Sequence, residues 1–218
     1  MHTQPDHKPT IFICADHGLA VIYFLQSDVM PALLDAGIQV VVLTDDALVE
    51  GIRQRFARPG MAVEGLRLKQ ASQYAAQTHP EIQWWLGFLR RVGSSGKINT
   101  EAQDAYVAQV AVEEGWKRRL WMPLARLYIH GLRRSRRLRQ GLVNFQQRFT
   151  PGLYHDLFER YQPDLVVAST HGWRLDRYLL REAAARRIRT AAAIVGWDNP
   201  SSYGLRGAPV DTITCWSE

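Results

Sequence analysis

The chain has 218 residues, of which 46% are hydrophobic and 22% charged, a composition that excludes a disordered chain and suits one large α/β core. Its apolar runs fall far short of the roughly 20 residues that cross a bilayer, so we expect no transmembrane helix. Residues 1–8 lack a signal-peptide pattern, and Cys14 and Cys215 lack metal-ligand spacing, which favours the cytoplasm. The net charge of +6 favours anionic partners.

The first part of the chain alternates strands with helices. Apolar runs predict strands over residues 10–15, 39–43 and 63–68. Helical stretches are expected over residues 19–36, where Gly37 supplies the stop, and over residues 47–56. Near-continuous Val and Ile runs separated by helices predict a parallel sheet that is covered on both faces.

From about residue 71 to residue 149 the apolar residues recur at helical spacing, which predicts a helical insertion after the third strand. Its stretch Gly93-Ser94-Ser95-Gly96-Lys97 is not a phosphate loop, because its spacing is wrong and Ile98 stands where Ser or Thr is needed. Strands are then expected over residues 165–168, 191–195 and 210–216, with a helix over 174–187. The predicted fold class is α/β, a Rossmann-like doubly wound and mostly parallel sheet in a single domain, residues 1–218.

In such sheets ligands bind at the carboxyl ends of the strands, which directs attention to four loops. They are residues 16–18, 44–46, 169–172 and 197–202. The first loop has a single glycine, Gly18, whereas a dinucleotide site requires G-x-G-x-x-G, so the sequence disfavours NAD binding.

These loops carry the candidate site residues, each with a structural alternative. His17 is the candidate general base and Asp16 could orient its imidazole, unless His17 is an ordinary turn residue. Candidates for binding the acceptor are Ser169, Thr170, His171, Trp197, Asp198 and Asn199, whose alternative roles are helix capping, turn formation and packing. Asp45 and Asp46 are expected to cap a helix rather than bind a metal or ribose, and no metal cluster is visible.

The insertion carries a basic segment, because no Asp or Glu occurs from residue 115 to residue 155. Its candidate membrane or anion patch consists of Trp116, Lys117, Arg118, Arg119, Trp121, Arg126, Arg133, Arg134, Arg136 and Arg137. A segment that mixes aromatic and basic side chains is typical of proteins that bind an anionic membrane surface. The alternative is a solvated helix whose arginines extend over core residues. Nucleic acid is disfavoured, since no recognised nucleic-acid motif is present.

Two stretches resemble the amino-terminal domain of GT-B-fold glycosyltransferases. Residues 11–44 read IFICADHGLAVIYFLQSDVMPALLDAGIQVVVLT and resemble the opening βαβ unit, and the end of the chain resembles the segment that leads into the interdomain linker, from PDLVVASTHGWRLDRYLLREAAARRIRTAAAIVGWDNPSSYG through VDTITCWSE. The chain is also similar to glycerophosphotransferases and to sugar-nucleotide epimerases of this fold. The helical middle has no counterpart.

The resemblance implies an acceptor-binding half whose donor, a nucleotide sugar, is held by a carboxy-terminal domain in the same or another chain, with no cofactor on this chain. It places His17 in the region of the catalytic base, although many family members read Gly-His where this chain reads His17-Gly18. Asp198 and Asn199 would then face the cleft, and the basic helices would dock on a membrane carrying a carbohydrate or lipid-linked acceptor.

The leading hypothesis is therefore half of a glycosyltransferase of cell-surface polysaccharide or glycolipid synthesis, cytoplasmic and peripheral to the inner membrane surface. By itself it should show no turnover. The alternative is a non-catalytic Rossmann-like module that binds an anionic partner, lipid or nucleic acid, through its Arg-rich helices.

Overall fold

The computed structural model describes residues 8–194 and 204–214. Within them six strands form one all-parallel sheet in the order β3-β2-β1-β4-β5-β6. The strands are β1 Thr10–Ala15, β2 Gln39–Thr44, β3 Met61–Gly65, β4 Leu165–Ala168, β5 Arg189–Ala193 and β6 Thr212–Thr214. This sheet confirms the predicted α/β, Rossmann-like fold class.

Helices cover both faces of the sheet, because successive side chains of each strand point to opposite sides. Ile13 and Ala15 of β1 lie in the core beneath α1 Gly18–Leu25, α2 Val29–Asp35 and α3 Val49–Phe56. Phe12 and Cys14 lie in the core of the other face, with α4 Leu68–Gln77, α9 His155–Tyr161 and α10 Arg177–Ala185. Both cores are apolar, which explains the near-continuous apolar runs of the central strands.

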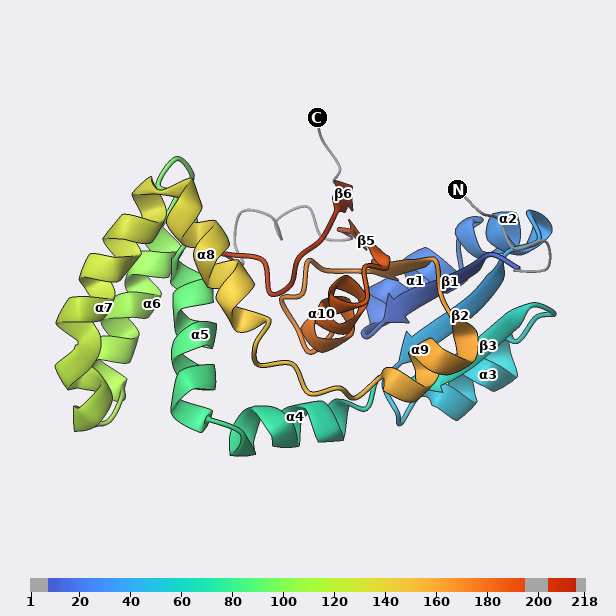
Figure 1. Ribbon diagram of the computed structural model, residues 1–218, viewed down its shortest axis with the longest axis horizontal. Coiled ribbons are helices and arrows are strands. Elements are labelled where there is room, and N and C mark those ends of the chain that lie inside the picture. The colour runs from blue at the N-terminus through green and yellow to red at the C-terminus, as the bar shows by residue number, and fades with distance from the viewer. Residues whose placement is uncertain (1–7, 195–203, 215–218) are drawn as a thin grey trace.

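Between β3 and β4 the chain forms a group of helices with a core of its own. After α4 come α5 Pro80–Val92, α6 Glu101–Glu113, α7 Trp116–Arg134 and α8 Arg136–Gln146. Phe88, Val107 and Met122 pack together in the core shared by α5, α6 and α7. Figure 1 shows α5 to α8 at one end of the molecule, with α4 leading to them from the sheet.

The expected helix over residues 19–36 is wrong in one respect, because two helices occupy this stretch. The break lies between Leu25 and Val29, one turn before Pro31. Proline has no N–H to donate and its ring crowds the carbonyl four residues earlier, so Pro31 disfavours a helix through residue 27, although α7 continues through its own Pro123. Gly37 follows α2 with φ +76, as a helix stop requires.

Several element bounds differ from the expectations, among them the start of α3 at Val49 rather than at residue 47 and the start of β6 at Thr212 rather than at residue 210. β3 starts two residues early, at Met61, and β5 starts at Arg189 rather than at residue 191. α10 starts at Arg177, since residues 169–176 form turns that side-chain hydrogen bonds hold together.

Among the described helices, no single one has the length and apolar composition to cross a membrane. Helices α1 and α2 have enough length and apolar composition only when they are taken together, as a pair bent by 45°. Their side chains Phe24, Leu25 and Met30 are buried in the core of the sheet.

Candidate functional site

The carboxyl ends of β1 and β4 meet at the centre of the sheet. Cys14 of β1 pairs with Ala168 of β4, so the residues that follow each strand are neighbours. The connections leave β1 and β4 in opposite directions, which makes this edge the topological switch point where ligands bind in open α/β sheets. His17 and His171 follow these two strands and therefore lie at the same edge. Trp197, Asp198 and Asn199 lie outside the described residues.

Asp16 is the centre of a hydrogen-bonded group at this edge. Its buried carboxylate accepts a hydrogen bond from Ser169 Oγ at 3.0 Å and forms an ion pair with Arg174 Nε at 2.9 Å. Its Oδ1 also lies 2.7 Å from His17 Nδ1. Burial raises the pKa of Asp16, but the bonds from His17 and Ser169 and the charge of Arg174 outweigh it and lower the pKa overall. Asp16 is therefore an ionised acceptor.

The imidazole of His17 is oriented by that carboxylate. An ionised carboxylate can only accept, so the 2.7 Å contact requires Nδ1 to carry the proton and leaves the lone pair on Nε2. The side chain of His17 keeps 21% of its exposure, whereas that of Asp16 keeps 3%. In this pair a buried carboxylate orients a partly exposed imidazole. The same arrangement serves to remove a proton from a hydroxyl group in known enzymes.

Ser169 and Thr170 face inward. The Ser169 hydroxyl is used by Asp16, and the Thr170 hydroxyl donates to Asp176 Oδ2 at 2.6 Å while it accepts from the N–H groups of Gly172 and Trp173. Both side chains are buried. They support the loop after β4 and offer no free hydroxyl to an acceptor.

Arg174 and Asp176 belong to this site although the sequence analysis missed them. Asp176 has no exposed surface and accepts from Thr170 and from the backbone N–H of Arg174. Burial and then the charge of Asp16 raise the pKa of Asp176 to about 6. Both residues follow the polar loop directly in the sequence, but the ion pair of Arg174 with Asp16 depends on the strand order.

His171 is also buried, and Arg90 of α5 closes the loop beside it. No described residue forms a hydrogen bond with His171 Nδ1, and burial, followed by the charges of Arg90 and Arg206, lowers the pKa of the imidazole. Arg90 donates to the carbonyls of Gly172 at 3.3 Å and Trp173 at 3.4 Å. Burial lowers the pKa of Arg90 to about 10. An acceptor cannot reach His171 without movement of the loop.

The loop after β2 caps a different helix from the expected one. Asp45 accepts from the N–H of Ala47 in a local turn. The carboxylate of Asp46 accepts from the N–H groups of Arg67 at 3.0 Å and Leu68 at 2.8 Å, so it caps α4 rather than α3. The described residues contain no group of three His, Cys, Asp or Glu that could hold a metal.

Two cations of the basic segment are neutralised within the protein. Arg118 pairs with Glu81 at 3.0 Å and with Glu114 at 2.7 Å. Arg133 pairs with Asp104 at 2.8 Å. Glu81 and Asp104 lie on α5 and α6, and Glu114 lies just before α7, so a segment without acids in its own sequence still has paired arginines. The other members Lys117, Arg119, Arg126, Arg134, Arg136 and Arg137 are exposed, as are Trp116 and Trp121.

Two hollows of the described surface lie away from the β1–β4 edge. One of about 720 Å³ is lined by Arg187, Arg189 and Asp211, where β5 and β6 begin, and so lies at the opposite edge of the sheet. Another, of about 560 Å³, lies between α5 and α7. The β1–β4 edge is identified by its side chains.

Comparison with known proteins assigns no family: no protein-family model matches the chain, and no curated protein matches it.

Proposed function

We propose that the chain is the acceptor-binding half of a glycosyltransferase-like enzyme, which transfers a sugar from a nucleotide sugar to a hydroxyl group. One observation carries the proposal. The buried carboxylate of Asp16 orients the partly exposed imidazole of His17 at the switch point of an all-parallel sheet.

The chemistry follows from the proton positions. Asp16 holds the Nδ1 proton of His17, so Nε2 is free to accept the proton of an acceptor hydroxyl as its oxygen attacks the anomeric carbon of the donor. The nucleotide then leaves with the electron pair of the broken glycosidic bond. The charge on Asp16 stabilises the imidazolium that forms.

In this proposal the nucleotide-sugar donor binds to a second domain, in the same or another chain. The loop between β1 and α1 has one glycine, Gly18, and lacks the glycine pattern that lets a backbone approach a pyrophosphate. The acceptor belongs to the carbohydrates or lipid-linked sugars of cell-surface polysaccharide and glycolipid synthesis, as the resemblance to GT-B enzymes implies.

Binding to the chain itself is the first test. Ligand-observed NMR compares methyl glycosides and short oligosaccharides with UDP-sugars and GDP-sugars. We expect some glycosides to bind and His17→Ala to abolish their signal, while the matched control His130→Ala, on the exposed part of α7, retains it. Binding of nucleotide sugars alone, or of none of these compounds, contradicts the proposal.

Turnover is the second test. With a donor-binding domain present, His17→Gln should lower kcat by roughly 10² to 10⁴, the usual contribution of a general base, with a smaller change in KM for the acceptor. The purified chain alone should show no transfer. An equal rate for His17→Gln would remove His17 from the mechanism.

A further inference from the structure

The outer face of α7 is apolar although it faces solvent. Successive helix residues are turned by about 100°, which places six side chains on one sector of roughly 140°. Their exposed fractions run from 38% to 72%, and they are Trp116, Leu120, Trp121, Leu124, Leu127 and Tyr128. The opposite sector, with Met122 and Ile129, packs in the core against α5 and α6. The outer apolar sector is uncovered within the described part of the chain.

Positive charge accompanies this apolar sector. Lys117 lies inside it, whereas Arg119 and Arg126 lie roughly 60° and 80° beyond its Trp116 edge, and all three are exposed. α7 has no acidic residue. The nearby carboxylates of Glu81 and Glu114 are occupied by Arg118, whose guanidinium also lies 4.1 Å from the ring centroid of Trp84. The charge of Lys117, Arg119 and Arg126 therefore faces outward.

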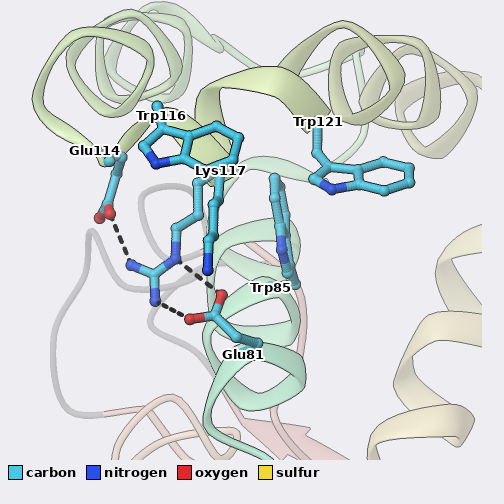
Figure 2. Close-up of a pocket in the computed structure, with 8 residues that line it drawn as sticks. Glu81, Trp85, Glu114, Trp116, Lys117 and Trp121 are labelled. Atoms are coloured by element: carbon cyan, nitrogen blue, oxygen red, sulfur yellow. Dashed lines mark hydrogen bonds and ion pairs between the residues drawn. The ribbon is translucent and has the colours of Figure 1, made fainter.

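A groove between α5 and α7 continues the same surface. Its polar end, a hollow of about 560 Å³, is lined by Glu81, Lys117 and Arg118 together with tryptophans. Figure 2 shows Trp85, Trp116 and Trp121 around it, with Lys117 among them. Trp85 and Trp121 also line the adjoining apolar hollow of about 380 Å³, which extends to Leu89, Leu124, Ala125 and Tyr128. One end thus suits a charged headgroup and the other a hydrocarbon chain.

We propose that the outer face of α7, with the α5–α7 groove, docks on a bilayer that contains anionic lipid. Tryptophan and tyrosine favour the headgroup level, leucines enter the acyl boundary, and basic side chains contact anionic headgroups. A second copy is a poor occupant, because a symmetric contact would bring together two α7 faces that both carry positive charge and no acidic residue. Nucleic acid is also a poor occupant, because binding to its phosphates would not explain why Leu120 and Leu127 are exposed on this face. The inference does not depend on the role of His17.

Vesicle co-sedimentation of the full chain tests the proposal, with phosphatidylcholine alone and with one-third phosphatidylglycerol. We expect binding to the anionic vesicles that weakens with salt. Leu120→Gln with Leu127→Gln should lower the partition coefficient at least about tenfold. Val112→Gln is the matched control, since Val112 is 73% exposed but belongs to α6, and it should change nothing.

The charge contribution is tested separately. A basic residue near an anionic surface contributes about 1 kcal/mol, or about fivefold in binding. Replacing Lys117, Arg119 and Arg126 by Gln should therefore weaken binding about a hundredfold. Wild-type chain that stays in the supernatant at low salt, or that sediments equally with neutral vesicles, overturns the proposal. So does binding to RNA without binding to vesicles.

The orientation is tested by fluorescence. Brominated lipid in the anionic vesicles should quench the chain's tryptophan emission, and Trp116→Phe with Trp121→Phe should remove most of that quenching while binding persists. Undiminished quenching in this variant, or unchanged binding of the Leu120→Gln, Leu127→Gln variant, would mean that another face docks, which overturns the proposal.

Discussion

Asp176→Asn is expected to reverse the order of stability of variant and wild type between pH 4 and pH 7. Asp176 is fully buried, and burial together with the charge of Asp16 raises its pKa from 3.8 to about 6. The folded protein therefore holds a proton that the unfolded chain has already released between these values, so stability falls as the pH rises through this window. The shift corresponds to about 3 kcal/mol, with a slope of at most about 1.4 kcal/mol per pH unit.

The amide removes this dependence but leaves the Thr170 hydroxyl without its carboxylate acceptor, at a cost of about 1 kcal/mol. The variant should therefore be about 1 kcal/mol less stable than wild type at pH 4 and about 2 kcal/mol more stable at pH 7. Urea unfolding at several pH values measures both curves. Their difference cancels the contributions of His171 and Glu182, whose pKa values are also shifted. A difference that stays constant with pH would refute the reasoning.

Three further predictions concern packing and burial. Gly207→Ala should lower the urea midpoint markedly because its new Cβ would collide with the Gly172 carbonyl, whereas Gly141→Ala in α8, where the Cβ meets nothing within 4 Å, should raise stability by about 0.5–1 kcal/mol. Glu182→Gln should cost about 1 kcal/mol in urea unfolding, since an NH₂ group replaces Oε2 and leaves the N–H of Tyr154 only its longer contact, 3.3 Å, with the remaining oxygen. Burial raises the pKa of the Cys14 thiol, so brief alkylation at pH 8 should leave Cys14 unmodified in the folded chain and should modify it after unfolding in urea. Mass spectrometry measures both states. Labelling of Cys14 in the folded chain would contradict this burial.

The sheet could be predicted because its central strands are buried on both faces. Residues 11–15 and 40–43 are apolar without alternation, and this pattern suffices for a parallel strand. The ends of β5 and α10 could not be predicted, since hydrogen bonds of Asp211 and Asp176 to distant or turn residues determine where the regular structure begins. The break before α2 lies one turn before Pro31, but a proline alone does not decide such a break, since α7 continues through Pro123.

The site was predictable only where its parts are neighbours in sequence. Asp16 and His17 are adjacent, so a contact between them could be weighed from the sequence alone. Ser169 and Arg174 reach the same carboxylate from more than 150 residues away, and that contact requires β1 and β4 to be neighbours in the sheet. The same holds for Arg118, whose partner Glu81 lies on another helix, so a count of charges along the segment overestimates its free cations.

Helix α5 connects the two proposed surfaces. Trp85 in its middle lines the groove beside α7, and Arg90 in its last turn donates to the carbonyls of Gly172 and Trp173 beside the β1–β4 edge. Five helical residues span about 7.5 Å, and Leu205 bonds to the carbonyl of Arg90 from the other side. A bilayer bound at α7 would therefore lie at a set height relative to His17, because a single helix held at both ends leaves little freedom between them.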